Sequence, residues 1–318
     1  MLVQGAGGNV SWKEGNALWI KASGTWLADA ESSDIFVPVD LSSLQKGIAS
    51  RNFNVKPATL CNTSLRPSIE TLLHAVMPHR VVAHLHAIDV LAWVVRRSFA
   101  DEVATRLAGV CEWTWVDYSK PGPELAHAVH RELAIRPESN IVLLGNHGII
   151  AGADSTEDLS RLYERVLFAL KCPEIVPMAA ESHPAVPPWI LATGYRTEYD
   201  PDIAALAYNA LLLDRLQRDW ALYPDHVVFL GEQPAIHNAH RDHESVPALS
   251  EQYGYMIVPH IGVFTRPDFN KNQRAMLKCF SQLARRLPAD IHPRTLCRRD
   301  IGELLNWDAE RYRQSIAR

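Results

Sequence analysis

Short apolar runs alternate along the chain with segments whose apolar residues recur at helical spacing. The first kind predicts strands at residues 17–21, 35–39, 80–86, 113–117 and 141–144. The second kind predicts helices at 41–50, 89–96, 101–107, 123–133 and 156–170, and a further one that begins at Ser68 as its N-cap. Because strands and helices alternate, we expect an α/β fold in which helices cover a sheet.

Five prolines within residues 172–188 interrupt this pattern and predict a linker or domain boundary. Two domains are therefore expected, at residues 1–175 and 190–318, the second being a smaller α/β extension. Its predicted helices are 201–218, 272–287 and a polar tail at 299–313, and its predicted strands are 226–230, 255–258 and 262–264.

Composition narrows the class of protein. Hydrophobic residues make up 47% and charged residues 21%, the balance of a soluble globular protein. The longest uncharged stretch, 139–153, is too short to span a membrane, and no signal peptide is apparent. A net charge of −4 with interspersed signs argues against nucleic acid as the main partner. Five cysteines, an odd number without a C-x-x-C pair, fit a reducing, cytoplasmic location.

The unusual count is 14 histidines. His84 and His86 stand two apart on a predicted strand, so their side chains share one face. His147 follows another predicted strand, between Asn146 and Gly148. Neutral imidazoles are common ligands of divalent metals, and catalytic zinc takes three protein ligands. A metal site and a set of ordinary core histidines both remain open from spacing alone.

Other titratable residues lie near this set in the sequence. Glu70, in the first turn of a predicted helix, is either a general acid/base or an acid placed there by the helix dipole. His74, four residues later, is expected to be a surface or packing histidine. The run His237-x-x-His240-x-x-His243 reads as a loop and is weak evidence for a second metal.

Several motifs occur together and in order: Gly8-Asn9-Val10-Ser11, Ser23-Gly24, Pro67-Ser68-Ile69-Glu70, His84-Leu85-His86 and Asn146-His147-Gly148. This series, over about residues 4–170, resembles the class II aldolase/adducin family, which includes fuculose- and rhamnulose-phosphate aldolases. More loosely, Tyr223-Pro224-Asp225-His226-Val227 and residues 258–264 resemble the aldolase part of bifunctional rhamnulose-phosphate aldolase/dehydrogenase proteins. We expect no dehydrogenase domain in this chain, and the family's helix before the glycine-rich loop is not apparent.

The resemblance implies a three-layer sheet covered by helices and a set of roles. His84, His86 and His147 would hold Zn²⁺ or a similar divalent ion, and Glu70 would exchange protons with the substrate. The phosphate pocket would be built by four residues: Asn9, Ser23, Gly24 and Ser68. Retro-aldol cleavage of a ketose phosphate or related sugar leaves an enediolate, whose charge suits a Lewis acid.

Three features depart from the family. Ile69 stands where relatives often have a second serine, which removes a phosphate hydroxyl. Lys21 either offsets that loss or is a solvated strand residue. Tyr118 is the nearest candidate for the tyrosine proton donor of the family aldolases, and the sequence favours a buried structural tyrosine over that role.

The resemblance leaves more than one function open. A metal-dependent lyase comes first; a sugar-phosphate epimerase, dehydratase or decarboxylase would use the same metal set, and a non-catalytic adducin-like scaffold is a different class. The resemblance also implies a homo-oligomer, with a tetramer favoured, and a small sugar or sugar phosphate as substrate.

Overall fold

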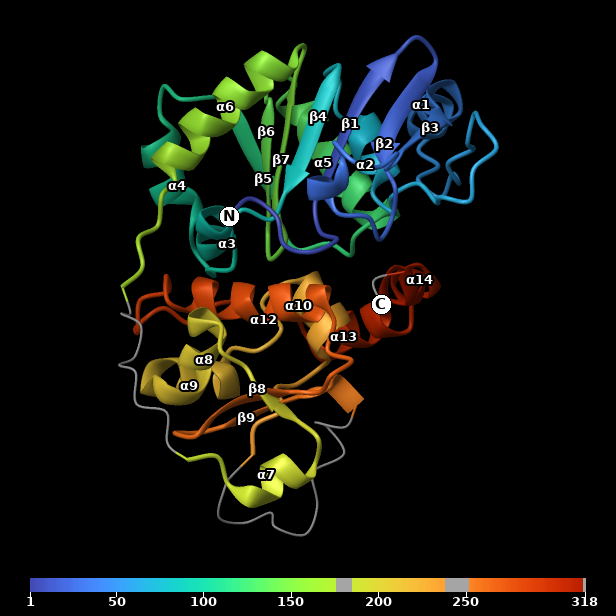
Figure 1. Cartoon of the computed structure of the whole chain (residues 1–318). Helices are drawn as coiled ribbons and strands as arrows, with labels where there is room; N and C mark the ends of the chain where they lie inside the picture. The colour runs from blue at the N-terminus through green and yellow to red at the C-terminus, as the bar shows by residue number, and fades with distance from the viewer. Residues whose placement is uncertain (176–184, 238–251, 317–318) are drawn as a thin grey trace.

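The computed structural model describes residues 1–175, 185–237 and 252–316. Two sheets organise these residues, one of seven strands and one of three. The seven-stranded sheet lies at one end of the molecule and the three-stranded sheet at the other, with helices α10 and α12 between them (Figure 1). The expected α/β class is therefore confirmed, as is an additional sheet-and-helix region in the C-terminal part.

The large sheet has the order β3-β2-β1-β4-β7-β6-β5. All neighbours are antiparallel except β5 and β6, which are parallel. Strand β4 is central, because β1 and β7 pair with it on either side. The strands are β1 (Asn9–Glu14), β2 (Ala17–Lys21), β3 (Phe36–Asp40), β4 (Val81–Leu85), β5 (Trp113–Val116), β6 (Ile141–Leu144) and β7 (Gly148–Ala153).

Helices cover both faces of this sheet, so it is the middle of three layers. Alternate residues of β4 face opposite sides: Val81 and Ala83 belong to one apolar cluster and Val82 to another. The first cluster contains α3 (Ile88–Val94), α4 (Ala100–Leu107) and α6 (Thr156–Ala169). The second contains α1 (Leu41–Ala49), α2 (Thr71–Val76) and α5 (Pro123–Ile135). A 3-10 turn, η1, spans Leu27–Asp29.

The C-terminal part builds a smaller sheet with the order β8-β10-β9 and a layer of helices above it. Its strands are β8 (Arg196–Thr197), β9 (Tyr255–Val258) and β10 (Gly262–Thr265). Its helices are α7 (Pro188–Ala192), α8 (Pro201–Tyr208), α9 (Ala210–Arg218), α10 (Pro224–Leu230), α12 (Lys271–Ala284), α13 (Arg298–Leu305) and α14 (Asp308–Ile316).

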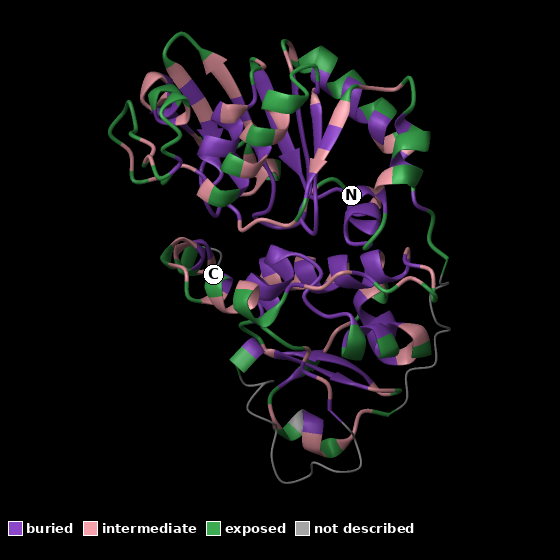
Figure 2. Cartoon of the chain, turned by 180° about the vertical axis from the view of Figure 1, so that it is seen from behind, coloured by how far each residue is buried: buried purple, intermediate pink, exposed green. Residues whose placement is uncertain are grey.

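One apolar cluster joins the two parts. It runs from α3 beneath the large sheet to α8, α10 and α12 of the C-terminal part. Figure 2 shows the buried residues concentrated in the large sheet and in the helices that lie between the two sheets. Within the described segments, no helix is long and apolar enough to cross a membrane.

The structure corrects several expected elements. Residues 226–230 belong to helix α10 and not to a strand, because Pro224 opens a helix whose residues are all buried against α12 and α13. The expected helix 201–218 breaks at Asn209, whose side chain caps α9. The expected single polar helix at the end of the chain is two helices, α13 and α14. Two of its charged residues, Glu310 and Arg313, are buried and not exposed to solvent.

Three strands, β1, β7 and β8, were not expected from the sequence. The expected linker falls partly on residues 176–184, which lie outside the described residues.

Candidate metal centre and active site

Strand β4 supplies two of the three candidate ligands. His84 lies in the strand and His86 directly after it, both fully or nearly fully buried. Nδ1 of His84 lies 3.1 Å from the carbonyl oxygen of Ile149. Because a carbonyl only accepts hydrogen bonds, Nδ1 carries the proton and Nε2 keeps its lone pair. The neighbouring strand thus selects the tautomer that can bind a metal through Nε2.

The turn between β6 and β7 supplies His147. Asn146 adopts a left-handed conformation with φ of 50°, and Gly148 has φ of 148°. A side chain at position 148 would collide with the carbonyl oxygen of Leu85, so the β7 strand can approach β4 only with glycine there. The Asn146 amide donates hydrogen bonds of 2.9 and 2.6 Å to two backbone carbonyls of the C-terminal part. The Asn-His-Gly motif therefore fixes His147 against both halves of the chain.

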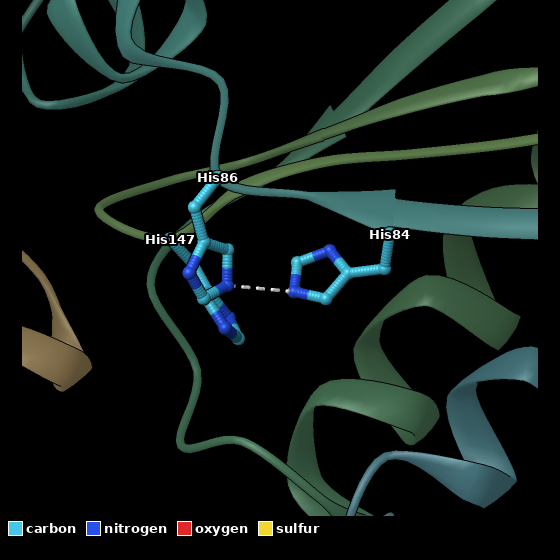
Figure 3. A group of neighbouring side chains, drawn as sticks. All are labelled: His84, His86 and His147. Atoms are coloured by element: carbon cyan, nitrogen blue, oxygen red, sulfur yellow. Dashed lines mark hydrogen bonds between the residues drawn. The ribbon is translucent and has the colours of Figure 1, made fainter. Parts of the chain in front are cut away.

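The three imidazoles converge at one point (Figure 3). Their candidate ligand atoms all lie within 4.8 Å of one another, and Nε2 of His84 is 3.0 Å from Nε2 of His86. Tetrahedral zinc places its nitrogen ligands about 3.3 Å apart, close to that pair's separation. Burial holds the pKa of His84 and of His147 well below the usual value, so both rings are neutral, as ligands must be. The donor set thus fits a divalent metal.

Glu70 completes this cluster. It is buried at the residue before α2, with Oε1 3.4 Å from Nε2 of His147 and Oε2 3.5 Å from Nε2 of His84. Asn9 donates a hydrogen bond of 2.7 Å to Oε2. Burial raises the pKa of Glu70 to about 8 when no metal charge is present. A carboxylate in this position can accept or return a proton near neutral pH.

The sequence placed Glu70 in the first turn of a helix opened by Ser68, and the structure differs slightly. Helix α2 begins only at Thr71, and Glu70 occupies its N-cap position without a capping hydrogen bond from its side chain. The Ser68 hydroxyl instead accepts a hydrogen bond of 3.2 Å from the Glu70 backbone N–H. Ser68 therefore caps the turn that presents Glu70, which leaves the Glu70 carboxylate turned toward the histidines.

The residues expected to bind phosphate share one small pocket with His86, His147 and Glu70. Its lining includes Asn9, Ser23, Gly24 and Ser68, together with Lys21. The enclosed space is a cavity of about 20 Å³, room for a water molecule or an ion. A second, larger cavity of about 500 Å³ adjoins it and shares Ser23 and Ser68 in its wall. In this conformation the small pocket is too small for a whole sugar phosphate.

Lys21 is buried, so the view of it as a solvated strand residue is wrong. Its ammonium donates hydrogen bonds to the carbonyl oxygens of Ala6 at 3.2 Å and Thr25 at 2.7 Å. Burial lowers the pKa of Lys21 to about 7. The pocket thus holds a lysine that an anion would readily keep protonated.

The C-terminal part contributes three residues that sequence reasoning missed. Asp225, at the start of α10, lies 3.3 Å from Nδ1 of His86. Arg313 of α14 is 2.7 Å from the same carboxylate and 3.3 Å from Glu310. All three are buried and line the small pocket. The Tyr-Pro-Asp-His motif was the one available signal for Asp225, whereas no local pattern marked Glu310 or Arg313.

Helix α14 also forms part of the wall of both cavities, through Glu310 and Arg313 in the small one and Tyr312 in the larger one. Ile316 would be 3.1 Å from a Cβ built on Gly24, and the ring of Tyr312 lies 3.9 Å from the guanidinium carbon of Arg66. The C-terminal helix therefore rests directly on the residues expected to bind phosphate.

His74, Tyr118 and His237 lie outside this cluster of three histidines and Glu70. His74 is a packing histidine, fully buried, with Nδ1 2.7 Å from the Ser11 hydroxyl, and is not at the surface. Tyr118 is half-buried and lies outside the lining of the small pocket. Of the second histidine run, His237 is buried beside β9, while His240 and His243 lie outside the described residues.

Fold and site together define a three-layer α/β protein with a buried cluster of three histidines and a glutamate at one end of its sheet. The Class II Aldolase and Adducin N-terminal domain family matches residues 1–172, more than half of the chain. The chain therefore belongs to the class II aldolase/adducin family.

One relative, described as "Uncharacterized oxidoreductase YuxG" of Bacillus subtilis (strain 168), is 27% identical over an alignment of 167 residues that covers 48% of this chain and 24% of the relative. The match thus spans about a quarter of that relative's length.

Solved structures with similarity to the chain include an N-terminal class II aldolase domain of a conserved protein from Thermoplasma acidophilum. It is 21% identical with a TM-score of 0.45, covering 52% of this chain and 83% of the other. An L-fuculose 1-phosphate aldolase is 21% identical with a TM-score of 0.39, covering 52% and 74%. YgbL of Klebsiella pneumoniae, described as a putative aldolase/epimerase/decarboxylase, is 20% identical with a TM-score of 0.39, covering 53% and 78%.

Proposed function

We propose that this protein is a metal-dependent aldehyde-lyase that cleaves a ketose phosphate or a related sugar by a retro-aldol reaction. The observation that carries the proposal is the placement of Glu70 within 3.5 Å of two histidines of a buried triad. The same site could serve an epimerase, dehydratase or decarboxylase, which share the need for a metal and a proton carrier. A purely structural role gives no reason for a buried carboxylate at this position next to the histidines.

His84, His86 and His147 are proposed to hold the divalent ion, and we favour zinc because three neutral imidazoles suit it. When bound, the ion supplies a Lewis acid that stabilises negative charge on the oxygens of the enediolate. The imidazoles are fixed before binding, since His84 is held by the Ile149 carbonyl and His147 by the β6–β7 turn.

Glu70 is proposed to carry the proton. In cleavage, its carboxylate takes the proton of the hydroxyl at the bond to be broken, and its carboxylic acid returns it to carbon in the enediolate. Oε2 is held by Asn9, while Oε1 has no hydrogen-bond partner among the residues that the structure describes. The unpartnered oxygen is therefore the one from which we expect proton transfer.

The anionic group of the substrate is proposed to bind among Asn9, Ser23, Gly24 and Ser68, next to Lys21. A buried ammonium attracts an anion strongly because little water screens it. Ile69 supplies no hydroxyl, and Lys21 supports phosphate binding in its place. The small pocket cannot hold a whole sugar phosphate, and α14 forms part of the wall of both this pocket and the larger cavity. We therefore expect α14 to shift when the substrate binds.

We further propose the division of the chain into a domain at residues 1–175 and an extension at 190–318. All five cysteines are free thiols, which supports a reducing compartment, and we propose the cytoplasm. We also propose that the protein forms a homo-oligomer, with a tetramer favoured. Its partner is a small molecule and not a nucleic acid.

The test is a cleavage assay on the zinc-loaded chain with L-fuculose 1-phosphate, L-rhamnulose 1-phosphate and their unphosphorylated ketoses. We expect release of dihydroxyacetone phosphate or another small carbonyl product, its loss with a chelator, and its recovery on adding zinc. An isomer of unchanged mass would indicate an epimerase instead, loss of water a dehydratase, and loss of carbon dioxide from a sugar acid a decarboxylase. The variant Glu70→Gln should cleave the same substrate at a strongly reduced rate, whereas a fully active variant would contradict the role of Glu70.

A further inference from the structure

Asp225 lies against the metal ligand His86 on the side away from the other histidines. Its Oδ2 is 3.3 Å from Nδ1 of His86, while Nε2 of His86 is 3.0 Å from Nε2 of His84. Neither Nδ1 of His86 nor Oδ2 of Asp225 has another polar partner among the described residues, and both side chains are at most 3% exposed. Two buried polar atoms without other partners are therefore matched to each other.

The orientation of His86 follows from this contact. Because an ionised carboxylate only accepts hydrogen bonds, Nδ1 of His86 carries the proton and Nε2 keeps its lone pair for the metal. In His84, the backbone carbonyl of Ile149 selects the same tautomer. A carboxylate is the stronger acceptor, and metal-bound histidines commonly have such a partner.

Arg313 of α14 keeps the Asp225 carboxylate in place. Its Nη2 lies 2.7 Å from Oδ1, the oxygen that does not face His86, and its Nη1 lies 3.3 Å from Glu310. The aspartate is therefore a fixed anion whose two oxygens have separate partners.

The glycine-rich loop leaves room for the contact. A Cβ built on Gly7 would lie 2.7 Å from Oδ2 of Asp225 and 2.9 Å from Nδ1 of His86. Real Cβ atoms do not approach so closely, so any larger residue at position 7 would push the two side chains apart. The first residues of the chain thus meet the start of α10 at this point.

We propose that Asp225 is a positioning residue for His86, held by Arg313, so that the C-terminal part completes the metal centre of the N-terminal part. The inference rests on the proposed function in one respect: His86 must bind the metal. It assigns a role to the Tyr-Pro-Asp-His segment and to α14, both outside the residues that match the family.

The test measures metal affinity, not catalysis. The full-length chain is stripped of metal and titrated with Zn²⁺ against a chromophoric chelator at pH 7.5, and Asp225→Asn is compared with the wild type. We expect Asp225→Asn to bind zinc roughly 10–100-fold more weakly, the usual effect of removing such a partner. Arg313→Gln should weaken binding to a smaller extent, and Arg313→Lys should recover part of the loss.

A matched control separates this effect from general destabilisation. Asp219 forms a buried ion pair with Arg215 at 2.5 Å, also in the C-terminal part, and does not line the metal pocket. Asp219→Asn should lower stability while zinc affinity stays within about twofold of the wild type, because His86 keeps its partner. Gly7→Ala is a second test that leaves Asp225 intact, and it should weaken zinc binding in the same direction as Asp225→Asn.

Cobalt provides a second readout. In the Co²⁺-substituted wild type and Asp225→Asn proteins, we expect the visible absorption bands to differ, because the ligand field depends on the orientation of His86. Zinc affinity and cobalt spectra of Asp225→Asn that equal those of the wild type would overturn this inference alone. A wild-type chain that takes up no divalent metal would overturn the proposed function and this inference together.

Discussion

The side-chain amide of Asn9 donates a hydrogen bond of 2.7 Å to Oε2 of Glu70. The two residues come from different elements, Asn9 from the start of β1 and Glu70 from the turn before α2. Backbone pairing of Asn9 with His84 fixes the amide beside the histidines. One oxygen of the glutamate is thus held while the other faces His147 at 3.4 Å.

The first prediction concerns this hydrogen bond. Because the Asn9 donor stabilises the ionised form of Glu70, Asn9→Ala should raise the pKa of Glu70 further. The acid limb of the pH profile of kcat/KM should then move upward by about one pH unit. Asn16→Ala is the matched control, since the exposed Asn16 makes a similar bond of 3.0 Å to the half-buried Asp40, far from the histidines. An unchanged acid limb in Asn9→Ala would show that this bond does not tune Glu70.

Glu70→Gln is predicted to separate metal binding from proton transfer. Glutamine keeps the shape of the side chain and cannot take up a proton, so the rate should fall by about 10²–10⁴-fold while zinc stays bound. Hydrogen–deuterium exchange on the hydroxymethyl carbon of dihydroxyacetone phosphate, followed by NMR, measures this step directly. Exchange at the wild-type rate in Glu70→Gln would assign the proton carrier to another residue.

The stability of the metal-free chain should depend on pH through Glu70. Its pKa is raised from 4.5 to about 8 in the folded state, so the folded state holds the proton more tightly between these values. The stability contributed by protonated Glu70 is therefore present in full below pH 4.5 and is lost as the pH rises through 8. His84 and His147 have lowered pKa values and act in the opposite direction below pH 6.5, so a comparison with a variant is required.

The measurement is urea unfolding of metal-free wild type and Glu70→Gln between pH 5.5 and 8.5. The free energy of unfolding of the wild type should fall relative to the variant by a few kcal/mol, on the order expected for such a shift. Saturating zinc should remove most of this difference, because a nearby dication favours the ionised carboxylate. Parallel pH curves for the two metal-free proteins would mean that Glu70 titrates normally.

Lys21→Met is predicted to affect phosphorylated substrates selectively. Methionine retains most of the buried volume and removes the positive charge, so KM for a ketose phosphate should rise roughly 10–100-fold. KM for the unphosphorylated ketose should change much less. Lys46→Met, at an exposed position of α1, is the control and should change neither value. Equal increases in KM for both substrates would place the anionic group elsewhere.

Local patterns in the sequence indicated where the three histidines lie, whereas the metal site and the three-layer fold were expected only from the family resemblance. His84 and His86 share a strand face by their spacing, and Asn146-His147-Gly148 marks a turn by its residue types. The apolar run at residues 226–230 was wrongly predicted as a strand, because a short buried helix and a buried strand have the same composition. Strand β1 was missed because its polar residues Asn9 and Ser11 point into the protein, toward Glu70 and His74. The usual pattern of apolar residues inside and polar residues outside is therefore absent.

Of the C-terminal contribution to the site, the Tyr-Pro-Asp-His motif marked only Asp225, and no local pattern marked Glu310 or Arg313. Arg313 contacts Asp225, and Asp225 contacts His86, so the ion pairs join segments that are far apart in the sequence. A buried arginine on a largely polar helix looks like any exposed helix residue until its partners are known. The four residues expected to bind phosphate line the small pocket, but the position of α14 beside them could be found only in three dimensions.

The central claim is that His84, His86 and His147 hold a divalent metal beside Glu70. Anomalous X-ray diffraction from crystals of the zinc-loaded protein, recorded above and below the zinc absorption edge, locates the ion itself. We expect one strong anomalous peak between the Nε2 atoms of the three imidazoles, and none there in crystals of His84→Ala. A zinc-loaded crystal without a peak at this point, or with its peak bound by other residues, would contradict the claim.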